Sequence, residues 1–301
     1  MQPRHVWVDG RVQPADTTHL SVFDRGFQLG DGIFETLRAR AGRVTEIDEH
    51  VARLQRSADG LGIPLPDQIG RIVERGIGEL LQEEGLDGPT ADASIRITVS
   101  RGAFRGRGLL PTDEPVEPTI AIQAWPVVPP PAGHLERGLH LVSSSVRRDP
   151  LNPLAMLKTT SRADYVFARL EARRAGADDA LFLTVEGLLS EATSANIFLV
   201  RRAPDDELEL ATPALDCAIL PGTTRSWLLA WAGRAGLRAV EGWLTPRELA
   251  AASEAFVSSS VAGVLPVTQF DGRPIGTGRP GPWTMRARED REAFIRGVVP
   301  A

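Results

Sequence analysis

An apolar residue recurs every three or four positions between Asp48 and Leu61, and polar residues fill the positions between. This period is that of one buried face of an α-helix, so the segment predicts an amphipathic helix. Gly62 and Pro64 end the pattern, because glycine favours the position after a helix and proline cannot continue one. The segment Gln68–Gly85 carries the same period and predicts a second helix.

The first half of the chain also contains short runs rich in β-branched and apolar residues, which are typical of strands. His5–Val12 carries Asp9-Gly10 between two such runs and predicts an opening β-hairpin. Further strands are expected at Gly32–Ala39, Ser94–Ser100 and Thr119–Trp125. The first half is therefore expected to be a small α+β domain.

A proline-rich segment, Pro126–Gly133, separates the two halves of the chain. It contains four residues without a backbone N–H, so we expect an extended connector that continues neither a helix nor a sheet. The predicted domains are residues 1–125 and 135–301, joined by the connector at 126–134. Strands and helices alternate in the second half, which is typical of an α/β domain. The elements expected there are strands at Leu139–Ser143, Asp179–Thr184, Asn196–Val200 and Ala255–Ser258, and helices at Ser161–Arg174, Thr223–Ala235 and about Pro282–Gly297.

Composition makes several classes of function improbable. The 301 residues are 42% hydrophobic and 24% charged, as in ordinary globular proteins, and a net charge of −5 gives no general attraction to nucleic acid or anionic membranes. Cys217 is the only cysteine and the five histidines do not fall at metal-ligand spacing, so neither a disulfide framework nor a metal site is expected. There is no apolar N-terminal targeting segment and no apolar run of membrane-spanning length. We expect a cytoplasmic protein.

Lys158 ends a strongly apolar stretch that begins at Leu151. An amine in an apolar pocket loses hydration and its pKa falls, so it can attack an aldehyde or carry a proton. Glu191 follows in the segment Ser190–Asn196, and a buried carboxylate of this kind keeps a pyridine nitrogen protonated. Together the two residues indicate pyridoxal 5'-phosphate (PLP) chemistry, although each alone could be structural, the lysine at the end of a strand and the glutamate capping a turn.

A second group of residues predicts an anion site. Gly222, Thr223 and Thr224 open an expected helix, whose free N–H groups and dipole favour a phosphate, and the two hydroxyls add donors. A plain helix cap is the alternative. Ser260 could supply a further hydroxyl, and Arg53 could reach inward from its helix as a bidentate phosphate partner.

Five segments carry the motifs of one enzyme family in that family's order: Val22–Thr36, Glu49–Leu54, Leu157–Lys158, Glu191–Phe198 and Leu220–Arg225. With them the chain resembles the class IV (fold type IV) PLP-dependent aminotransferases. That family includes branched-chain aminotransferases, D-amino acid aminotransferases, R-selective amine transaminases and aminodeoxychorismate lyases. The resemblance implies a two-domain α/β enzyme that holds PLP between its domains and acts as a homodimer.

The resemblance also implies a role for each matching residue. Lys158 would form the imine with PLP and carry a proton between substrate and cofactor, and Glu191 would bind the pyridine nitrogen. Ala163 stands where many branched-chain enzymes place a tyrosine. Tyr165, the only tyrosine, is expected to face the wrong way to help the cofactor phenol oxygen. The phosphate-binding positions match Arg53, Gly222, Thr223, Thr224 and Ser260.

Guanidinium groups are the natural partners of a substrate carboxylate, because they bind it in a bidentate fork. Arg96 matches a site arginine of branched-chain enzymes, and if its strand alternates it faces opposite to its apolar neighbours. Arg105 and Arg107 lie in a glycine-containing loop where D-amino acid aminotransferases and aminodeoxychorismate lyases place theirs. Phe34 matches a substrate-facing tyrosine of some relatives. Solvation of the arginines and core packing of the phenylalanine are the alternatives.

The sequence therefore predicts a transaminase that moves an amino group from an amino acid to a 2-keto acid such as 2-oxoglutarate or pyruvate. D-amino acids and branched-chain L-amino acids are the leading donors. Aminodeoxychorismate lyase, which forms 4-aminobenzoate and pyruvate, and R-selective amine transaminase are alternatives within the fold. A PLP-binding dimer without activity is an alternative of another class. The stereochemical preference and the arginine that binds the substrate stay open.

Overall fold

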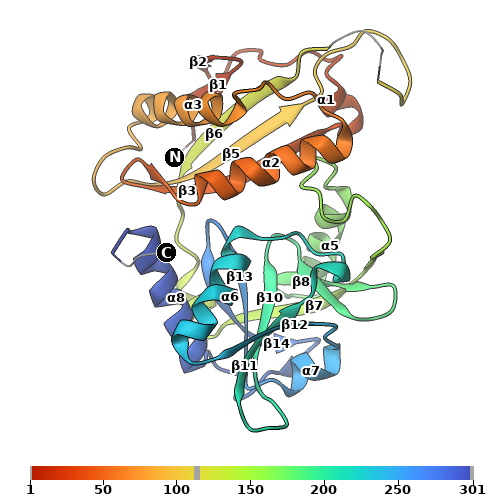
Figure 1. Cartoon of the computed structure of the whole chain (residues 1–301), viewed down its shortest axis with the longest axis vertical. Coiled ribbons are helices and arrows are strands. Elements are labelled where there is room, and N and C mark those ends of the chain that lie inside the picture. The colour runs from red at the N-terminus through yellow and green to blue at the C-terminus, as the bar shows by residue number, and fades with distance from the viewer. Residues whose placement is uncertain (1, 112–115, 299–301) are drawn as a thin grey trace. The chain divides into compact units, whose positions relative to one another are not determined.

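The computed structural model describes residues 2–111 and 116–298. The chain divides into two compact units, whose elements are labelled in Figure 1. Unit 1 comprises Met1–Val128 and Leu157–Arg162, and unit 2 comprises Pro129–Met156 and Ala163–Ala301. The short segment Leu157–Arg162 thus belongs to unit 1, although the residues on both sides of it belong to unit 2.

Unit 1 is built on a six-stranded antiparallel sheet with the order β2-β1-β6-β5-β3-β4. Its strands are β1 (His5–Val8), β2 (Arg11–Pro14), β3 (Gly32–Arg40), β4 (Arg43–Val44), β5 (Asp92–Ser100) and β6 (Thr119–Pro126). β1 and β2 form the predicted hairpin, and β3, β5 and β6 confirm the three other predicted strands. β3 and β5 pair along their whole length, from Gly32 opposite Ser100 to Arg40 opposite Asp92.

Three helices belong to the same unit: α1 (Arg25–Leu29), α2 (Ile47–Leu61) and α3 (Ile69–Glu84). α2 and α3 confirm the two helices that the apolar period predicts, and their apolar faces pack on the sheet in one hydrophobic core. α2 ends where Gly62 adopts a left-handed φ of 60°, a conformation that costs a residue with a Cβ free energy. The sequence pattern therefore accounts for the main elements of unit 1.

The sheet of unit 1 has two different faces. Ile95 and Ile97 of β5 are buried in the core, and Arg96 between them points to the opposite face, because successive strand residues alternate. Phe34 of β3 is paired with Thr98 of β5, two residues from Arg96, so these three side chains share one face. The expected orientation of Arg96 is confirmed.

Unit 2 contains a mixed sheet of nine strands. They are β7 (Leu139–Arg148), β8 (Asp179–Thr184), β9 (Leu189–Ala192), β10 (Asn196–Arg202), β11 (Leu208–Pro213), β12 (Arg238–Gly242), β13 (Glu254–Ser259), β14 (Gly263–Phe270) and β15 (Arg273–Pro274). Because β9 pairs with both β8 and β10, the sheet closes on itself through β10, β13, β14, β7, β8 and β9. Apolar side chains fill one side of this closed sheet.

The helical elements of unit 2 are α4 (Ala132–Glu136), α5 (Ala163–Arg174), the 3₁₀-helix η1 (Leu215–Cys217), α6 (Thr223–Ala235), α7 (Pro246–Ala251) and α8 (Pro282–Ile295). α6 has the predicted bounds, and its residues Trp227 and Trp231 join one hydrophobic cluster with Phe256 of β13 and Ala287 of α8. α5 packs on β7 and β8. α6 and α8 thus pack on the sheet in one hydrophobic cluster, and α5 packs on it in another.

Several features of the second half differ from the sequence predictions. The strands β9, β11, β12 and β14 were not predicted, and β8 to β11 follow one another without a helix, so strict alternation of helix and strand is wrong. The connector predicted at 126–134 is not wholly extended, because Pro126 ends β6 and α4 begins at Ala132. α5 begins at Ala163, two residues later than expected.

Candidate active site

Lys158 is the only lysine of the chain, so its side chain is the only one whose amine can form an imine with an aldehyde. Its segment runs beside β3: the Phe34 N–H donates to the Lys158 carbonyl at 2.9 Å, and the Thr160 N–H donates to the Gly32 carbonyl at 2.8 Å. The Lys158 N–H donates to the Ser57 hydroxyl at 3.1 Å. These bonds fix the backbone of Lys158, and its Nζ lies 4.6 Å from the centre of the Phe34 ring.

Part of the apolar stretch before Lys158 is exposed in the single chain, whereas Ala155 is buried and Leu157 is half-buried. Leu151 is 90% exposed, and Leu154 and Met156 are also exposed. Leu151, Leu154 and Met156 therefore do not enclose the amine within the single chain. The apolar surface beside the amine is the buried ring of Phe34.

Three cationic groups of unit 1 lie within 6 Å of the centre of the Phe34 ring. The distances are 3.9 Å for the Arg96 Cζ, 4.6 Å for the Lys158 Nζ and 5.6 Å for the Arg162 Cζ. Burial and the nearby charge of Arg162 lower the pKa of Arg96. The structure thus brings together Lys158, Arg96 and Phe34, three of the candidate site residues. Arg162 was not predicted as a site residue, although its position in the same loop as Lys158 indicates that it could lie near the amine.

Arg53 lies on the helix-covered face of the sheet in a buried cluster. Its Nε and Nη2 donate to the two carboxylate oxygens of Glu35 at 2.8 and 2.7 Å, and the Nδ1 of His50 lies 2.7 Å from Glu35 Oε2. Burial alone raises the pKa of Glu35, but the hydrogen bonds and charges of Arg53 and His50 lower it from 4.5 to about 2. Glu35, which was not predicted as a site residue, therefore fixes the guanidinium of Arg53.

Arg105 and Arg107 are exposed in a loop of unit 1. The Arg105 Cζ lies 6.0 Å from the centre of the Phe23 ring. In the described part of the chain, neither arginine contacts Phe34 or Arg96. The structure of the single chain therefore does not bring these two candidates to the Phe34 ring.

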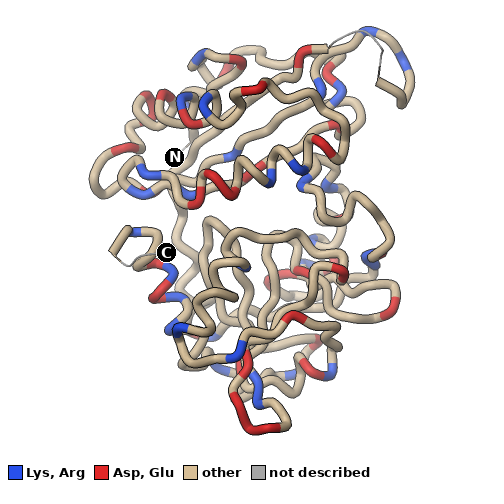
Figure 2. Tube along the Cα trace, viewed as in Figure 1, with Lys and Arg blue, Asp and Glu red and all other residues tan. Residues whose placement is uncertain are grey.

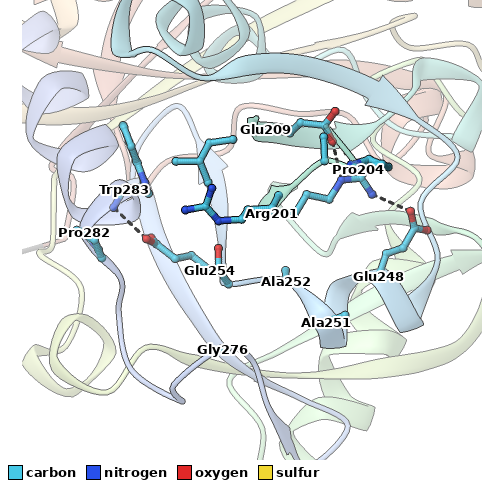
Figure 3. A pocket seen from close by; sticks show the side chains of 14 residues that line it. Arg201, Pro204, Glu209, Glu248, Ala251, Ala252, Glu254, Gly276, Pro282 and Trp283 are labelled. Carbon is cyan, nitrogen blue, oxygen red and sulfur yellow. Dashed lines mark hydrogen bonds and ion pairs between the residues drawn. The ribbon is translucent and has the colours of Figure 1, made fainter. Parts of the chain in front are cut away.

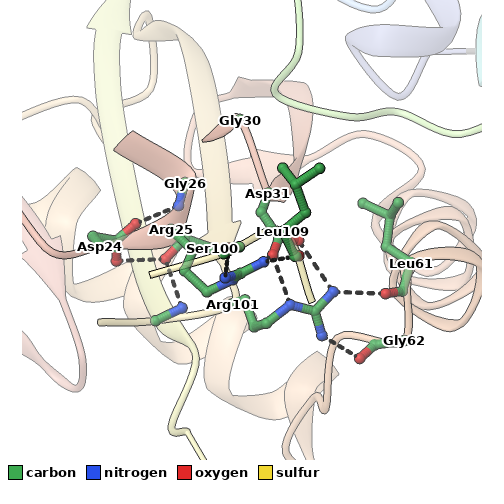
Figure 4. Close-up of polar contacts among 12 residues, drawn as sticks. Asp24, Arg25, Gly26, Gly30, Asp31, Leu61, Gly62, Ser100, Arg101 and Leu109 are labelled. Atoms are coloured by element: carbon green, nitrogen blue, oxygen red, sulfur yellow. Dashed lines mark hydrogen bonds and ion pairs between the residues drawn. The ribbon is translucent and has the colours of Figure 1, made fainter. Parts of the chain in front are cut away.

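The ends of this loop are held by a network around Asp31, shown in Figure 4. The Nε atoms of Arg25 and Arg101 each donate to Asp31 Oδ2 at 2.8 Å. Arg25 also donates to the Leu109 carbonyl at 2.7 Å, and Arg101 donates to the Gly62 carbonyl at the end of α2 at 2.6 Å. Burial raises the pKa of Asp31, but the two arginines outweigh it and lower that pKa. The network, which was not predicted, fixes the loop that carries Arg105 and Arg107.

Glu191 lies in unit 2 on strand β9 and is buried. Its Oε2 accepts the Leu220 N–H at 3.0 Å, and its Oε1 accepts the Tyr165 hydroxyl at 3.2 Å. The Nη2 of Arg148 lies 3.9 Å from the same Oε1. Glu191 is therefore a strand residue with both oxygens oriented, and it does not cap a turn.

Tyr165 is the third residue of α5 and lies beside Glu191. Its ring packs edge-on against Phe182 at 5.2 Å, and the Arg148 Cζ lies 5.2 Å from its centre. Its hydroxyl reaches Glu191. Tyr165 therefore faces the carboxylate predicted to bind the pyridine nitrogen, and its expected failure to reach the cofactor phenol oxygen stays a prediction.

The predicted anion site lies at the N-terminus of α6. Gly222 is the N-cap residue, so no side chain at this position accepts hydrogen bonds from the first N–H groups of α6. A Cβ at Gly222 would clash with the side chain of Asn196. The Thr223 hydroxyl lies 3.4 Å from the Ser260 hydroxyl. Thr224 instead accepts a hydrogen bond from Arg291 Nη2 at 3.2 Å. The structure thus brings Gly222, Thr223 and Ser260 together.

The residues of each unit fit the parts of PLP assigned to them. Unit 1 offers the single amine, and unit 2 offers an oriented carboxylate and an open helix N-terminus. The buried hydroxyl of Ser258, two residues before Ser260, makes no hydrogen bond with any described residue. A buried donor without a partner costs free energy, so it suits a bound oxyanion.

A cavity of about 960 Å³ lies elsewhere in unit 2 (Figure 3). Its charged groups are already paired, because Arg201 donates to Glu209 at 2.8 Å and to Glu248 at 2.7 Å. Glu254 accepts the Trp283 N–H at 3.1 Å at the start of α8. None of the predicted site residues lines it.

Two further observations concern the described residues as a whole. No group of three or more His, Cys, Asp or Glu among residues 2–111 and 116–298 could hold a metal ion. None of the helices in these ranges has the length and apolar character needed to cross a membrane. Basic and acidic residues are interspersed along the chain in each unit (Figure 2).

Comparison with known proteins places the chain in a family. The model of the family described as amino-transferase class IV matches residues 32–270. The chain is 30% identical over 289 residues to a D-alanine aminotransferase of Bacillus licheniformis, covering 94% of each protein. It is 31% identical over 308 residues to a branched-chain-amino-acid aminotransferase of Pseudomonas aeruginosa, covering 98% of this chain and 94% of the relative.

A solved structure extends the comparison to the cofactor. A T.th. branched-chain amino acid aminotransferase with pyridoxamine 5'-phosphate superposes with a TM-score of 0.90 at 27% identity, covering 100% of this chain and 96% of that one. The two-domain α/β fold and the PLP cofactor that the sequence predicted are confirmed. The chain belongs to the class IV aminotransferases and is a PLP-dependent enzyme.

Proposed function

We propose that the enzyme is an amino-acid transaminase that converts an amino acid and a 2-keto acid by a ping-pong cycle. One observation carries the proposal: the Lys158 amine and the Arg96 guanidinium lie 4.6 and 3.9 Å from the centre of the same phenyl ring. A proton carrier and a carboxylate-binding group are thus within reach of one small amino acid. D-amino acids and branched-chain L-amino acids are the proposed donors.

When bound, PLP supplies an electron sink that lets a proton leave the substrate Cα. Lys158 would hold the cofactor covalently and carry that proton. Glu191, whose oxygens are oriented by the Tyr165 hydroxyl and the Leu220 N–H, would accept the N–H of the pyridine ring, and its negative charge would keep this nitrogen protonated. In this proposal the residues that would bind the phosphate are Gly222, Thr223 and Thr224 at the start of α6, Ser260 after β13, and Arg53.

The substrate is held by residues of unit 1. Arg96 binds the substrate carboxylate in a bidentate fork, and Phe34 forms the apolar floor beside it. Arg105 and Arg107 are the other candidates, and their part of the loop lies between Arg101, which donates to the Gly62 carbonyl, and Leu109, whose carbonyl accepts from Arg25.

We propose further that the enzyme is a homodimer. Each unit exposes several large apolar side chains in the single chain, and burial of such side chains would favour association with a second copy. In unit 1 they are Val22, Phe23, Phe27, Leu29, Leu109 and Leu110, and in unit 2 they include Leu151, Leu154, Val166, Phe167 and Leu170.

The test is a half-reaction without a keto acid. Purified PLP-loaded protein is mixed separately with D-alanine, D-glutamate, L-leucine, L-glutamate and R-1-phenylethylamine, and the absorbance of the bound cofactor is followed. We expect one stereochemical set of amino acids to convert the cofactor to pyridoxamine 5'-phosphate. If no donor does so and the protein instead releases pyruvate from aminodeoxychorismate without a keto acid, the lyase reaction replaces the proposal.

A further inference from the structure

Arg162 is held in a fixed position at the end of the lysine loop. The hydroxyls of Thr160 and Ser161 donate to the Gly30 carbonyl at 2.9 and 3.2 Å. Gly30 has a φ of 66°, and a Cβ there would lie only 2.5 Å from the Ser161 Oγ. Glycine therefore permits the close approach that fixes the backbone before Arg162.

Arg162 and Arg96 bring two guanidinium groups to one aromatic ring. Their Cζ atoms lie 5.6 and 3.9 Å from the centre of the Phe34 ring. Arg96 donates to the neutral hydroxyl of Thr98 at 3.2 Å. Burial disfavours the charge of Arg96, and the nearby charge of Arg162 disfavours it further. A bound anion would offset both effects.

We propose that Arg162 is a specificity-determining residue that forms, together with Arg96, a binding site for a dicarboxylic substrate. The inference rests on the proposed function, because it assigns the site to the amino acid or keto acid that reacts beside Lys158. Each guanidinium binds one carboxylate of the substrate in a bidentate fork. A monocarboxylic keto acid such as pyruvate leaves one arginine without this partner, so a dicarboxylic keto acid such as 2-oxoglutarate is preferred.

The test compares two ligands of five carbons that differ in one carboxylate. Glutarate and pentanoate are titrated into the PLP-loaded enzyme by calorimetry, and neither ligand has an amine that can react. We expect the wild type to bind glutarate at least about tenfold more tightly than pentanoate, because a hydrogen-bonded charge pair contributes this much. Arg162→Gln should remove this preference and leave the pentanoate affinity within about twofold.

Two variants control the experiment. Arg56→Gln removes a charge from the exposed face of α2 in the same unit, and it should change neither affinity. Arg162→Lys keeps the charge without the planar fork, and it should retain part of the preference for glutarate. Circular dichroism and the PLP content show that each variant is folded.

The inference is overturned if the wild type does not prefer glutarate, or if Arg162→Gln weakens both ligands equally. Its failure is distinguishable from failure of the proposed function. If donors convert the cofactor but the glutarate preference does not depend on Arg162, the transaminase stands and the inference fails. If the preference depends on Arg162 but no donor converts the cofactor, the transaminase proposal fails instead.

Discussion

In unit 1 three cations lie within 6 Å of the centre of one phenyl ring, whereas in unit 2 the Glu191 carboxylate accepts hydrogen bonds from two neutral donors and has the Arg148 guanidinium at 3.9 Å. The cations of unit 1 repel one another, and this repulsion contributes to the lowered pKa of Arg96. The Glu191 carboxylate instead receives the Leu220 N–H and the Tyr165 hydroxyl. Unit 1 thus offers cationic groups that attract an anion, whereas Glu191 of unit 2 offers a buried carboxylate that attracts a hydrogen-bond donor or a cation.

The largest effect should come from removing the amine of unit 1. Lys158→Ala should lower transaminase turnover by about 10⁴-fold or more, since the covalent attachment and the proton carrier are both lost. Lys158→Arg keeps the positive charge beside Phe34 but forms no imine, so it should be as inactive. Turnover of either variant within about tenfold of the wild type would remove Lys158 from the mechanism.

Glu191→Gln tests the carboxylate of unit 2. The neutral amide should still allow PLP to bind but slow removal of the substrate Cα proton by about 10²-fold or more, because the pyridine nitrogen no longer stays protonated. Exchange of the Cα proton with deuterated solvent measures this step. Glu186→Gln changes an exposed glutamate of the same unit and should be neutral. Equal exchange rates in all three proteins would contradict the role of Glu191.

Glu35→Gln tests whether the buried ion pair of unit 1 is structural. The folded-state pKa of Glu35 is lowered to about 2, so its contribution to stability is present above its unfolded pKa and is lost as pH falls toward 2. We expect the wild type to lose roughly 3 kcal/mol of unfolding free energy from this group between pH 5 and pH 2.

At neutral pH, Glu35→Gln should cost about 3 kcal/mol, because Arg53 keeps a buried charge without its carboxylate. Urea unfolding of the wild type, Glu35→Gln and the exposed-site control Glu49→Gln, each at several pH values, measures both effects. In Glu35→Gln, the loss of unfolding free energy between pH 5 and pH 2 should be smaller than in the wild type by roughly 3 kcal/mol. An unchanged pH profile would show that Glu35 does not carry it.

The smallest effect is expected from Tyr165→Phe, which removes one donor from Glu191 and keeps the ring on Phe182. The remaining Leu220 N–H still orients the carboxylate, so PLP affinity should fall by about tenfold or less. The rate of PLP release and the pH dependence of its absorbance measure the change. If neither the rate of PLP release nor the pH dependence of the absorbance changes, the Tyr165 hydroxyl does not act through Glu191.

The strong periodic elements could be predicted from the sequence. The bounds of α2 and α3 lie within one residue of the prediction, and those of α6 agree with it. Apolar spacing marks α2 and α3, the Gly-Thr-Thr sequence marks the start of α6, and a glycine follows each of the three helices. β9 could not be found in this way. All four of its residues are buried, so the strand shows no alternation, and it is too short to stand out by length.

The site could be predicted in part. Lys158, Arg96 and Phe34 lie together because β3 and β5 pair in register and the lysine loop adds to the edge of β3. The contact of Tyr165 with Glu191 depends on where α5 begins, which counting from the lysine does not reveal. Arg162 was missed for a related reason, since a loop residue has no period that gives its direction.

Borohydride reduction of the PLP-loaded protein, followed by mass spectrometry of its peptides, tests the role of Lys158 most directly. Because the chain has one lysine, the reduced imine can be assigned without ambiguity among side chains. We expect one phosphopyridoxyl group per chain, on the peptide that contains Lys158. A reduced protein without this group, or with it only on the N-terminal amine, would contradict the proposed catalytic site.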